Sequence, residues 1–253
     1  MDYCVETFGL TRDFGKLRAV DGVDLRVERG VFYGFLGPNG AGKSTTIKML
    51  TGLLAPSGGS ARLLGRDLAR EPLEIKARMG VVPEDLCLFE NLTGREYLTF
   101  IARMYGLPKG VIGDRCEELL NLMGLIDAEK TLVLEYSHGM KKKLSLAAAL
   151  IHDPELLFLD EPFEGIDAIA SRTIRGVLER FIERESTVFL TSHILEIVER
   201  LCSHVGIIHQ GKLVAQGALS ELAQGAGLEK AFIQAVGEPE EAPPALSWLQ
   251  GER

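Results

Sequence analysis

Phe32–Leu50 reads FYGFLGPNGAGKSTTIKML and passes from an apolar stretch through a glycine-rich turn into an amphipathic segment. Gly37, Gly42, Lys43 and Ser44 fill the pattern G-x-x-x-x-G-K-[ST] in the strand–loop–helix context that it requires. Glycines allow a tight turn and a close approach of main-chain amides, and the start of the following helix favours phosphate. An ordinary turn before a helix is the alternative, but this context favours a phosphate-binding loop.

The phosphate loop assigns tasks to two side chains. Lys43 would reach the β- and γ-phosphates of a nucleotide, and the hydroxyl of Ser44 would hold Mg²⁺. A nucleotide phosphate and Mg²⁺ are therefore the expected ligands. The expected nucleotide contacts run through the loop and into the helix: Gly37, Pro38, Asn39, Gly40, Ala41, Gly42, Lys43, Ser44 and Thr45.

The composition is that of a globular protein of one large domain or two small ones. The chain has 253 residues, of which 46% are hydrophobic and 25% charged, with a net charge of −8. This acidic balance argues against broad nucleic-acid binding. The four cysteines contain no C-x-x-C pair, and reduced thiols in a cytosolic protein are expected. We expect no signal peptide and no membrane span, because the longest near-apolar run, Leu144–Ile151, is too short.

Alternating strand and helix patterns predict an α/β fold that is interrupted by a helical insertion. Four early strands are expected at Tyr3–Phe8, Arg18–Val20, Val23–Val27 and Val31–Leu36, and a short edge strand at Ala61–Leu64. Between residues 85 and 150 the pattern becomes helical, at Leu92–Tyr105, Val111–Met123 and Gly139–Ile151. Thr93 and Glu96 form a capping-box signal for the first of these helices.

The alternation then resumes towards the C-terminus. Strands are expected at Leu156–Leu159, Thr187–Leu190, Val205–His209 and Leu213–Ala215, with helices at Ala168–Arg184 and Ile194–Leu201. The acidic, proline-rich segment Pro239–Pro244 is expected to be a mobile tail.

Two adjacent carboxylates end an apolar strand in LLFLDEP, at Leu156–Pro162. Ligands of open α/β sheets bind at the carboxyl ends of the strands. Asp160 would therefore hold Mg²⁺ through water, and Glu161 would orient and deprotonate an attacking water. Two solvated acids at a strand end are the alternative. In YSHGMKKK, Ser137 can cap the following helix, whose amides would then face an anion.

Taken together, GPNGAGKST, YSHGM, LLFLDEP and TSH resemble the ATP-binding subunit of an ABC transporter, over about Cys4–Leu222. The resemblance implies a phosphate-loop NTPase core with an N-terminal antiparallel β subdomain and an inserted α-helical subdomain. The ATPase domain would span residues 1–223, with the helical subdomain at about 85–150. Residues 224–253 would form a partly mobile extension. YSHGM departs from the usual LSGGQ but is similar to the drug, antibiotic and sodium exporter branch.

The resemblance also implies roles for residues outside the phosphate loop. Phe14 matches the aromatic that stacks on adenine, although a core or turn aromatic is the alternative. Ser137, His138 and Gly139 match the signature segment, which contacts the γ-phosphate bound to the opposite protomer. Asp167 matches an aspartate that links the protomers. His193 matches the switch histidine that contacts the γ-phosphate, and a polar loop residue is the alternative. Glu161 and His193 would act in catalysis together with Lys43 of the loop.

Glu84 departs from the glutamine that most family members carry at the junction between core and helical subdomain. A carboxylate can bind Mg²⁺ more strongly than an amide, but it repels the γ-phosphate. The exporter branch often shows this glutamate, so it does not indicate inactivity, and a solvated loop acid is the alternative. The expected metal ligands are Ser44, Glu84 and Asp160.

The implied function is ATP hydrolysis that powers transport, with export suggested by the branch. Two copies, or this chain and a related one, would close around two Mg-ATP. A transmembrane permease would dock on the helical subdomain, which would hold the chain at the cytoplasmic face of the cell membrane. A regulatory or assembly ATPase without a transporter is the alternative. Intact Lys43, Asp160, Glu161 and His193 argue against a silent scaffold.

Overall fold

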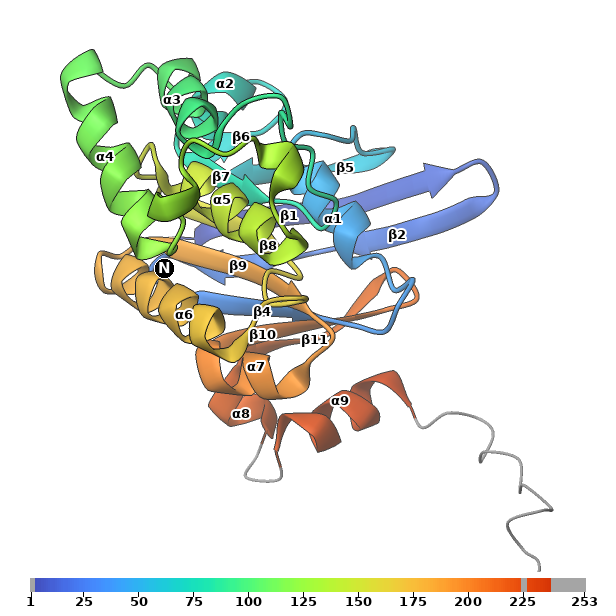
Figure 1. Cartoon of the computed structure of the whole chain (residues 1–253). Coiled ribbons are helices and arrows are strands. Elements are labelled where there is room, and N and C mark those ends of the chain that lie inside the picture. The colour runs from blue at the N-terminus through green and yellow to red at the C-terminus, as the bar shows by residue number, and fades with distance from the viewer. Residues whose placement is uncertain (1–2, 224–226, 238–253) are drawn as a thin grey trace, which may run out of the picture.

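A six-stranded, mostly parallel sheet lies at the centre of the protein (Figure 1). The computed structural model describes residues 3–223 and 227–237. The strand order is β11-β10-β4-β9-β8-β7, and β11 runs antiparallel to β10 while the other pairs are parallel. These strands span Phe32–Leu36 (β4), Met79–Val82 (β7), Leu156–Asp160 (β8), Thr187–Ser192 (β9), His204–His209 (β10) and Lys212–Ala218 (β11). Strands β4, β8 and β9 are buried throughout, as expected for parallel strands covered on both faces.

An antiparallel second sheet forms the N-terminal β subdomain that the sequence predicts. It contains Tyr3–Phe14 (β1), Leu17–Val23 (β2), Arg26–Glu28 (β3), Gly58–Leu63 (β5) and Arg66–Asp67 (β6). The predicted edge position of Ala61–Leu64 is wrong, because β5 lies between β1 and β6. Leu64 and Gly65 both have positive φ angles, of 54° and 77°, and form a tight turn that returns the chain to pair with β5.

The helices between residues 94 and 150 lie beside β7, at one edge of the parallel sheet (Figure 1). The main helices are Gly94–Met104 (α3), Lys109–Leu122 (α4) and His138–Leu150 (α5), and two short 3₁₀ turns lie at Ile126–Ala128 and Val133–Glu135. The predicted capping box at Thr93 is confirmed, since its side chain accepts from the amide of Glu96 and its own amide donates to the Glu96 carboxylate.

Tyr105 and His152 join the helical region to the edge of the parallel sheet. The two rings stack with centroids 3.6 Å apart and planes 7° apart. The hydroxyl of Tyr105 and Nε2 of His152 both lie near the carbonyl of Met79, at 3.5 and 3.1 Å. Burial lowers the pKa of His152 to about 4, so its ring is neutral near pH 7 and donates to that carbonyl.

The remaining helices flank the two sheets. They span Lys43–Leu50 (α1), Pro72–Lys76 (α2), Ala168–Glu183 (α6), Leu195–Leu201 (α7), Leu219–Ala223 (α8) and Leu228–Val236 (α9). Helix α9 lies in the predicted C-terminal extension and packs on α7, α8 and the β10–β11 hairpin. Leu228 is fully buried there, and its amide donates to Glu199. The predicted mobile tail at Pro239–Pro244 lies outside the described residues, and the boundary at residue 223 stays a prediction.

Four aromatic rings fill the space between the two sheets beneath β4, β8 and β9. Phe189 lies at the centre, with ring centroids 5.3 Å from Tyr33, 5.4 Å from Phe35 and 5.2 Å from Phe158. All four are at most 2% exposed. Truncating such a ring to alanine typically costs about 3–5 kcal/mol, so this aromatic cluster firmly fixes the three strands whose carboxyl ends carry the site.

Candidate active site

The phosphate loop lies between β4 and α1, and at two of its positions a residue larger than glycine would clash with neighbouring main-chain atoms. A Cβ on Gly37 would lie 2.4 Å from the carbonyl oxygen of Ile208. At Gly42 the φ angle is 108°, and a Cβ would lie 2.6 Å from the carbonyl oxygen of Ala19. Larger residues would therefore push the loop away from the β10 and β2 segments that support it.

Helix α1 begins at Lys43 without any side-chain cap, because the N-cap residue is Gly42. Its first amides are thus available to an anion, as they are in phosphate-binding helices. The Lys43 side chain folds back over the loop, where Nζ donates to the carbonyls of Gly37 (2.8 Å) and Pro38 (3.3 Å). The ammonium group is thereby held above the same loop that presents the amides.

Ser44 connects two carboxylates from distant parts of the chain. Its hydroxyl lies 3.2 Å from Oε2 of Glu84, just after β7, and 3.5 Å from Oδ1 of Asp160, at the end of β8. Asp160 is 3% exposed and accepts a hydrogen bond from Thr191 on the adjacent strand β9. Burial raises the pKa of Asp160, and repulsion from Glu84 adds to the effect, whereas the Thr191 hydrogen bond opposes it.

Glu161 turns sharply out of β8 and meets His193. Its φ angle is 48°, in the left-handed region that non-glycine residues rarely adopt. Its amide donates to the carbonyl and hydroxyl oxygens of Thr191, at 3.3 and 3.2 Å. Its carboxylate lies 3.0 Å from Nδ1 of His193, which follows β9. Strained backbone of this kind often marks functional positions, because the surroundings must hold it in place.

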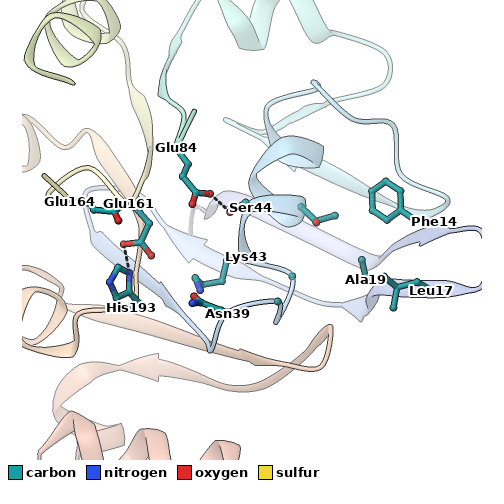
Figure 2. A pocket seen from close by; sticks show the side chains of 13 residues that line it. Phe14, Leu17, Ala19, Asn39, Lys43, Ser44, Glu84, Glu161, Glu164 and His193 are labelled. Atoms are coloured by element: carbon teal, nitrogen blue, oxygen red, sulfur yellow. Dashed lines mark hydrogen bonds and ion pairs between the residues drawn. The ribbon is translucent and has the colours of Figure 1, made fainter. Parts of the chain in front are cut away.

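A cavity of about 590 Å³ brings these groups together (Figure 2). Lys43, Ser44, Glu84, Glu161 and His193 all line it. The full lining comprises Phe14, Leu17, Ala19, Asn39, Gly40, Gly42, Lys43, Ser44, Thr45, Glu84, Glu161, Glu164 and His193. The space therefore extends from the phosphate loop to the carboxylates on one side and to the β1–β2 hairpin on the other.

Phe14 lies at the hairpin side of this cavity and is 46% exposed. The core-aromatic alternative is therefore wrong for this residue. The guanidinium of Arg12 lies over its ring, 4.6 Å from the centroid, and Arg12 also donates to the carbonyl of Ala55. This cation–π contact orients an exposed ring that is available for stacking.

The signature segment and Asp167 do not line this cavity. Ser137 caps α5, as predicted, by accepting from the amide of Met140. Asp167 caps α6 by accepting from the amides of Ile169 and Ala170, and these bonds lower its pKa. The two helix starts are neighbours, since a Cβ on Gly165 would lie 3.1 Å from the ring of His138.

Several predicted contacts of the phosphate loop do not face the cavity, and several lining residues were not predicted. Gly37, Pro38 and Ala41 are absent from the lining, and Ala41 is buried. Leu17, Ala19 and Glu164 were missed. The period-two alternation of the strand after Phe14 could have indicated the first two, because residues 17 and 19 share one face.

The donor set suits Mg²⁺ better than a softer metal. Ser44, Glu84 and Asp160 offer oxygen atoms alone, which is what Mg²⁺ prefers, usually together with substrate phosphates. Across the described part of the chain, no group of three or more His, Cys, Asp or Glu side chains is arranged to hold a metal by itself.

Comparison with known proteins identifies the family. A family model described as ABC transporter matches residues 20–164. The chain is 40% identical over 223 residues to the daunorubicin/doxorubicin resistance ATP-binding protein DrrA of Streptomyces peucetius. The match covers 88% of this chain and 68% of that protein. The chain belongs to the ABC transporter family. It is also 42% identical to the bacitracin transport ATP-binding protein BcrA of Bacillus licheniformis, over 85% of this chain and 70% of that protein.

Solved structures agree with this membership in the ABC transporter family. An ATP-binding subunit of an ABC transporter superposes with a TM-score of 0.87 at 30% identity, covering 92% of this chain and 99% of that one. CbiO1 of Clostridium perfringens, part of the ABC transporter complex cbiONQ, gives 0.76 at 26% identity, over 92% and 94%. The predicted fold class and the resemblance to the drug and antibiotic branch are confirmed. This chain is thus an ATP-binding, ATP-hydrolysing subunit of an ABC transporter.

Proposed function

We propose that Glu161 is the general base of ATP hydrolysis and that His193 orients it towards the γ-phosphate. The observation that carries the proposal is the 3.0 Å contact between the two side chains, in the cavity that also holds Lys43. Lys43 would neutralise the β- and γ-phosphates, and Phe14 would stack on adenine. Since phosphoryl transfer needs little covalent chemistry from the protein, positioning and charge neutralisation carry most of the catalysis.

Ser44 and Asp160 would hold Mg²⁺, and Glu84 would add a third oxygen ligand. The ion would supply charge neutralisation at the β- and γ-oxygens. Ser44 lies within 3.5 Å of both carboxylates, which supports a shared ligand. The carboxylate at Glu84 also adds negative charge beside Asp160, and Mg²⁺ would offset this charge when the polyphosphate binds.

Two copies of the chain, or this chain and a related one, would form the complete ATPase. Ser137, His138, Gly139 and Asp167 lie outside the cavity of their own chain. Ser137 caps α5, and the start of that helix is suited to meet a phosphate anion. We therefore assign the signature segment to the γ-phosphate bound by the opposite protomer, and Asp167 to the contact between protomers.

The helical region would dock a transmembrane partner, and we propose export as the direction. Phe89, Phe100 and Met104 expose 52%, 39% and 71% of their surface on this region, and Phe89 and Phe100 pack edge to face. Exposed apolar groups of this kind favour a protein partner. Among the described residues, no helix has the length and apolar character to cross a bilayer. Attachment at the cytoplasmic face would occur through that partner.

Cell fractionation tests the transporter assignment. With its membrane partner expressed, the chain should sediment with membranes, and deletion of the partner should release it. Met104→Asp should weaken the attachment, while Leu53→Asp, at an equally exposed apolar position after α1, serves as the control. A chain that remains wholly in the supernatant with each candidate permease would support the regulatory ATPase instead.

A further inference from the structure

Lys142 is a buried lysine whose ammonium group contacts the loop that carries Glu161. The residue lies in the second turn of α5 and is 2% exposed. Nζ donates to the carbonyl of Glu161 at 2.6 Å and to the carbonyl of Glu164 at 2.7 Å. Both partners are main-chain oxygens, so these contacts fix the backbone and leave the acidic side chains unengaged.

Burying an ammonium group is unfavourable unless strong acceptors replace water. Burial lowers the pKa of Lys142, while the nearby carboxylates of Glu164, Glu161, Glu84 and Asp160 oppose that shift. The neighbouring lysine offers a contrast, because Lys141 reaches the surface and pairs with Glu90. Of these adjacent lysines, Lys142 is thus the one directed at the active site.

The turn after β8 has few hydrogen bonds of its own and is held by side chains from other elements. Glu161 has a φ angle of 48°, and Pro162, which follows it, has no amide hydrogen to donate. Within the turn, the amide of Glu164 donates to the Glu161 carbonyl at a long 3.3 Å. Thr191 holds the amide side of Glu161, and Lys142 makes the shortest contact on its carbonyl side.

We infer that Lys142 is a positioning residue for the general base: it clamps the Glu161–Glu164 turn and thereby aims the Glu161 carboxylate. The inference rests on the proposed base role of Glu161. Because Lys142 lies one turn beyond Gly139 on α5, the same clamp ties the base to the helix that starts with the signature segment. A shift of α5 would displace the Glu161–Glu164 turn through the two hydrogen bonds of Lys142, and would thereby move the base.

Lys142→Met tests the clamp, since methionine keeps a long unbranched chain but removes the donors. A misplacement of about 1 Å can cost about 100-fold in rate, so kcat for ATP hydrolysis should fall roughly 10- to 100-fold. The Kd for ATP should stay within about threefold, because the phosphate loop is untouched. Lys142→Gln retains one donor pair and should give an intermediate kcat. Lys141→Met is the matched control, and its kcat should stay within about threefold because exposed ion pairs contribute little.

A double-mutant cycle with Glu161→Gln separates positioning from other roles. Once the base is absent, Lys142→Met should lower the residual rate by less than about twofold. An equal loss in both backgrounds would show that Lys142 acts independently of Glu161 and would overturn the inference. A wild-type kcat in Lys142→Met would also overturn the inference. A loss of ATP affinity in both Lys142→Met and Lys142→Gln would overturn it too, because it would indicate a purely structural role.

The same measurements distinguish the two proposals. If Glu161→Gln hydrolyses ATP at the wild-type rate, the base assignment fails and the positioning role falls with it. If Glu161→Gln is slow but Lys142→Met is not, the base remains and only the positioning role is lost. Should Lys142→Met fail to fold, Lys142→Gln carries the cycle, and full activity in that variant together with a folded apo state would also reject the clamp.

Discussion

Replacing Glu161 with glutamine removes the proposed base while leaving its surroundings in place. Glutamine has the same length, and the main-chain bonds to Thr191 and Lys142 do not depend on the side chain. General-base help is typically worth ~10²–10⁴-fold, or roughly 3–5 kcal/mol of barrier. The Glu161 side chain is 9% exposed and lines the cavity, where glutamine cannot accept a proton from the attacking water. We therefore expect a loss of about 10³-fold in kcat.

Nucleotide binding should survive this change, because Lys43, Ser44 and Asp160 are unaltered. The unhydrolysed γ-phosphate would then stay between the phosphate loop of one protomer and the signature segment of the other. With ATP and Mg²⁺ the Glu161→Gln protein should elute as a dimer, and with ADP or without nucleotide as a monomer. Phosphate release measures the rate, calorimetry the affinity, and light scattering behind a sizing column the mass.

A matched control is Glu179→Gln, which removes the same charge from an exposed position on α6. It should hydrolyse ATP like the wild type. Unchanged hydrolysis in Glu161→Gln would refute the base assignment. A slow variant that stays monomeric would preserve the base but count against a stable closed pair of the isolated subunit, and would point to closure by the membrane partner.

Two further changes probe binding and stability. Lys43→Ala removes the ammonium group above the loop and should weaken ATP binding strongly, because the loop amides alone must hold about three to four negative charges; wild-type affinity by calorimetry would contradict the phosphate site. The pKa of His152 is about 4 when folded and ~6.5 when unfolded, so stability should fall as the pH drops between these values. His152→Phe keeps the ring stacked on Tyr105 and should reduce the loss between pH 7 and 5 by about 1–2 kcal/mol. Urea unfolding at both pH values measures this, and an unchanged pH dependence would reject it.

The phosphate loop and the strand ends could be predicted from sequence because their requirements are local. Gly42 has a φ angle of 108°, which favours glycine, and Asp160 directly ends a buried apolar strand. The N-cap of α5 at Ser137 is equally local. Each of these features can be recognised within a few residues, so the pattern and the structure agree.

The burial of Lys142 and the turn at Leu64 depended on distant contacts. Lysine is rarely fully buried, so the run of three lysines favours exposed positions, and only the contacts with the Glu161–Glu164 loop show which one is enclosed. Leu64 looks like a strand residue, but it is buried and adopts a left-handed conformation because β6 returns to pair with β5. Neither outcome follows from local propensity.

The aromatic cluster around Phe189 has a consequence for which parts of the protein can move during ATP hydrolysis. Because one central ring packs against aromatics from both β4 and β8, a displacement of either strand relative to β9 would disrupt these contacts. We therefore expect the carboxyl ends of these strands to keep their relative positions during turnover, and other parts of the chain to move. The Tyr105–His152 stack beside the Met79 carbonyl is a place where such movement can occur, because it is a small, flat contact between the helices and the sheet edge. Substitutions in the aromatic cluster should thus lower the stability of the whole protein. Substitutions at Tyr105 or His152 should instead alter the movement of the helices relative to the sheet.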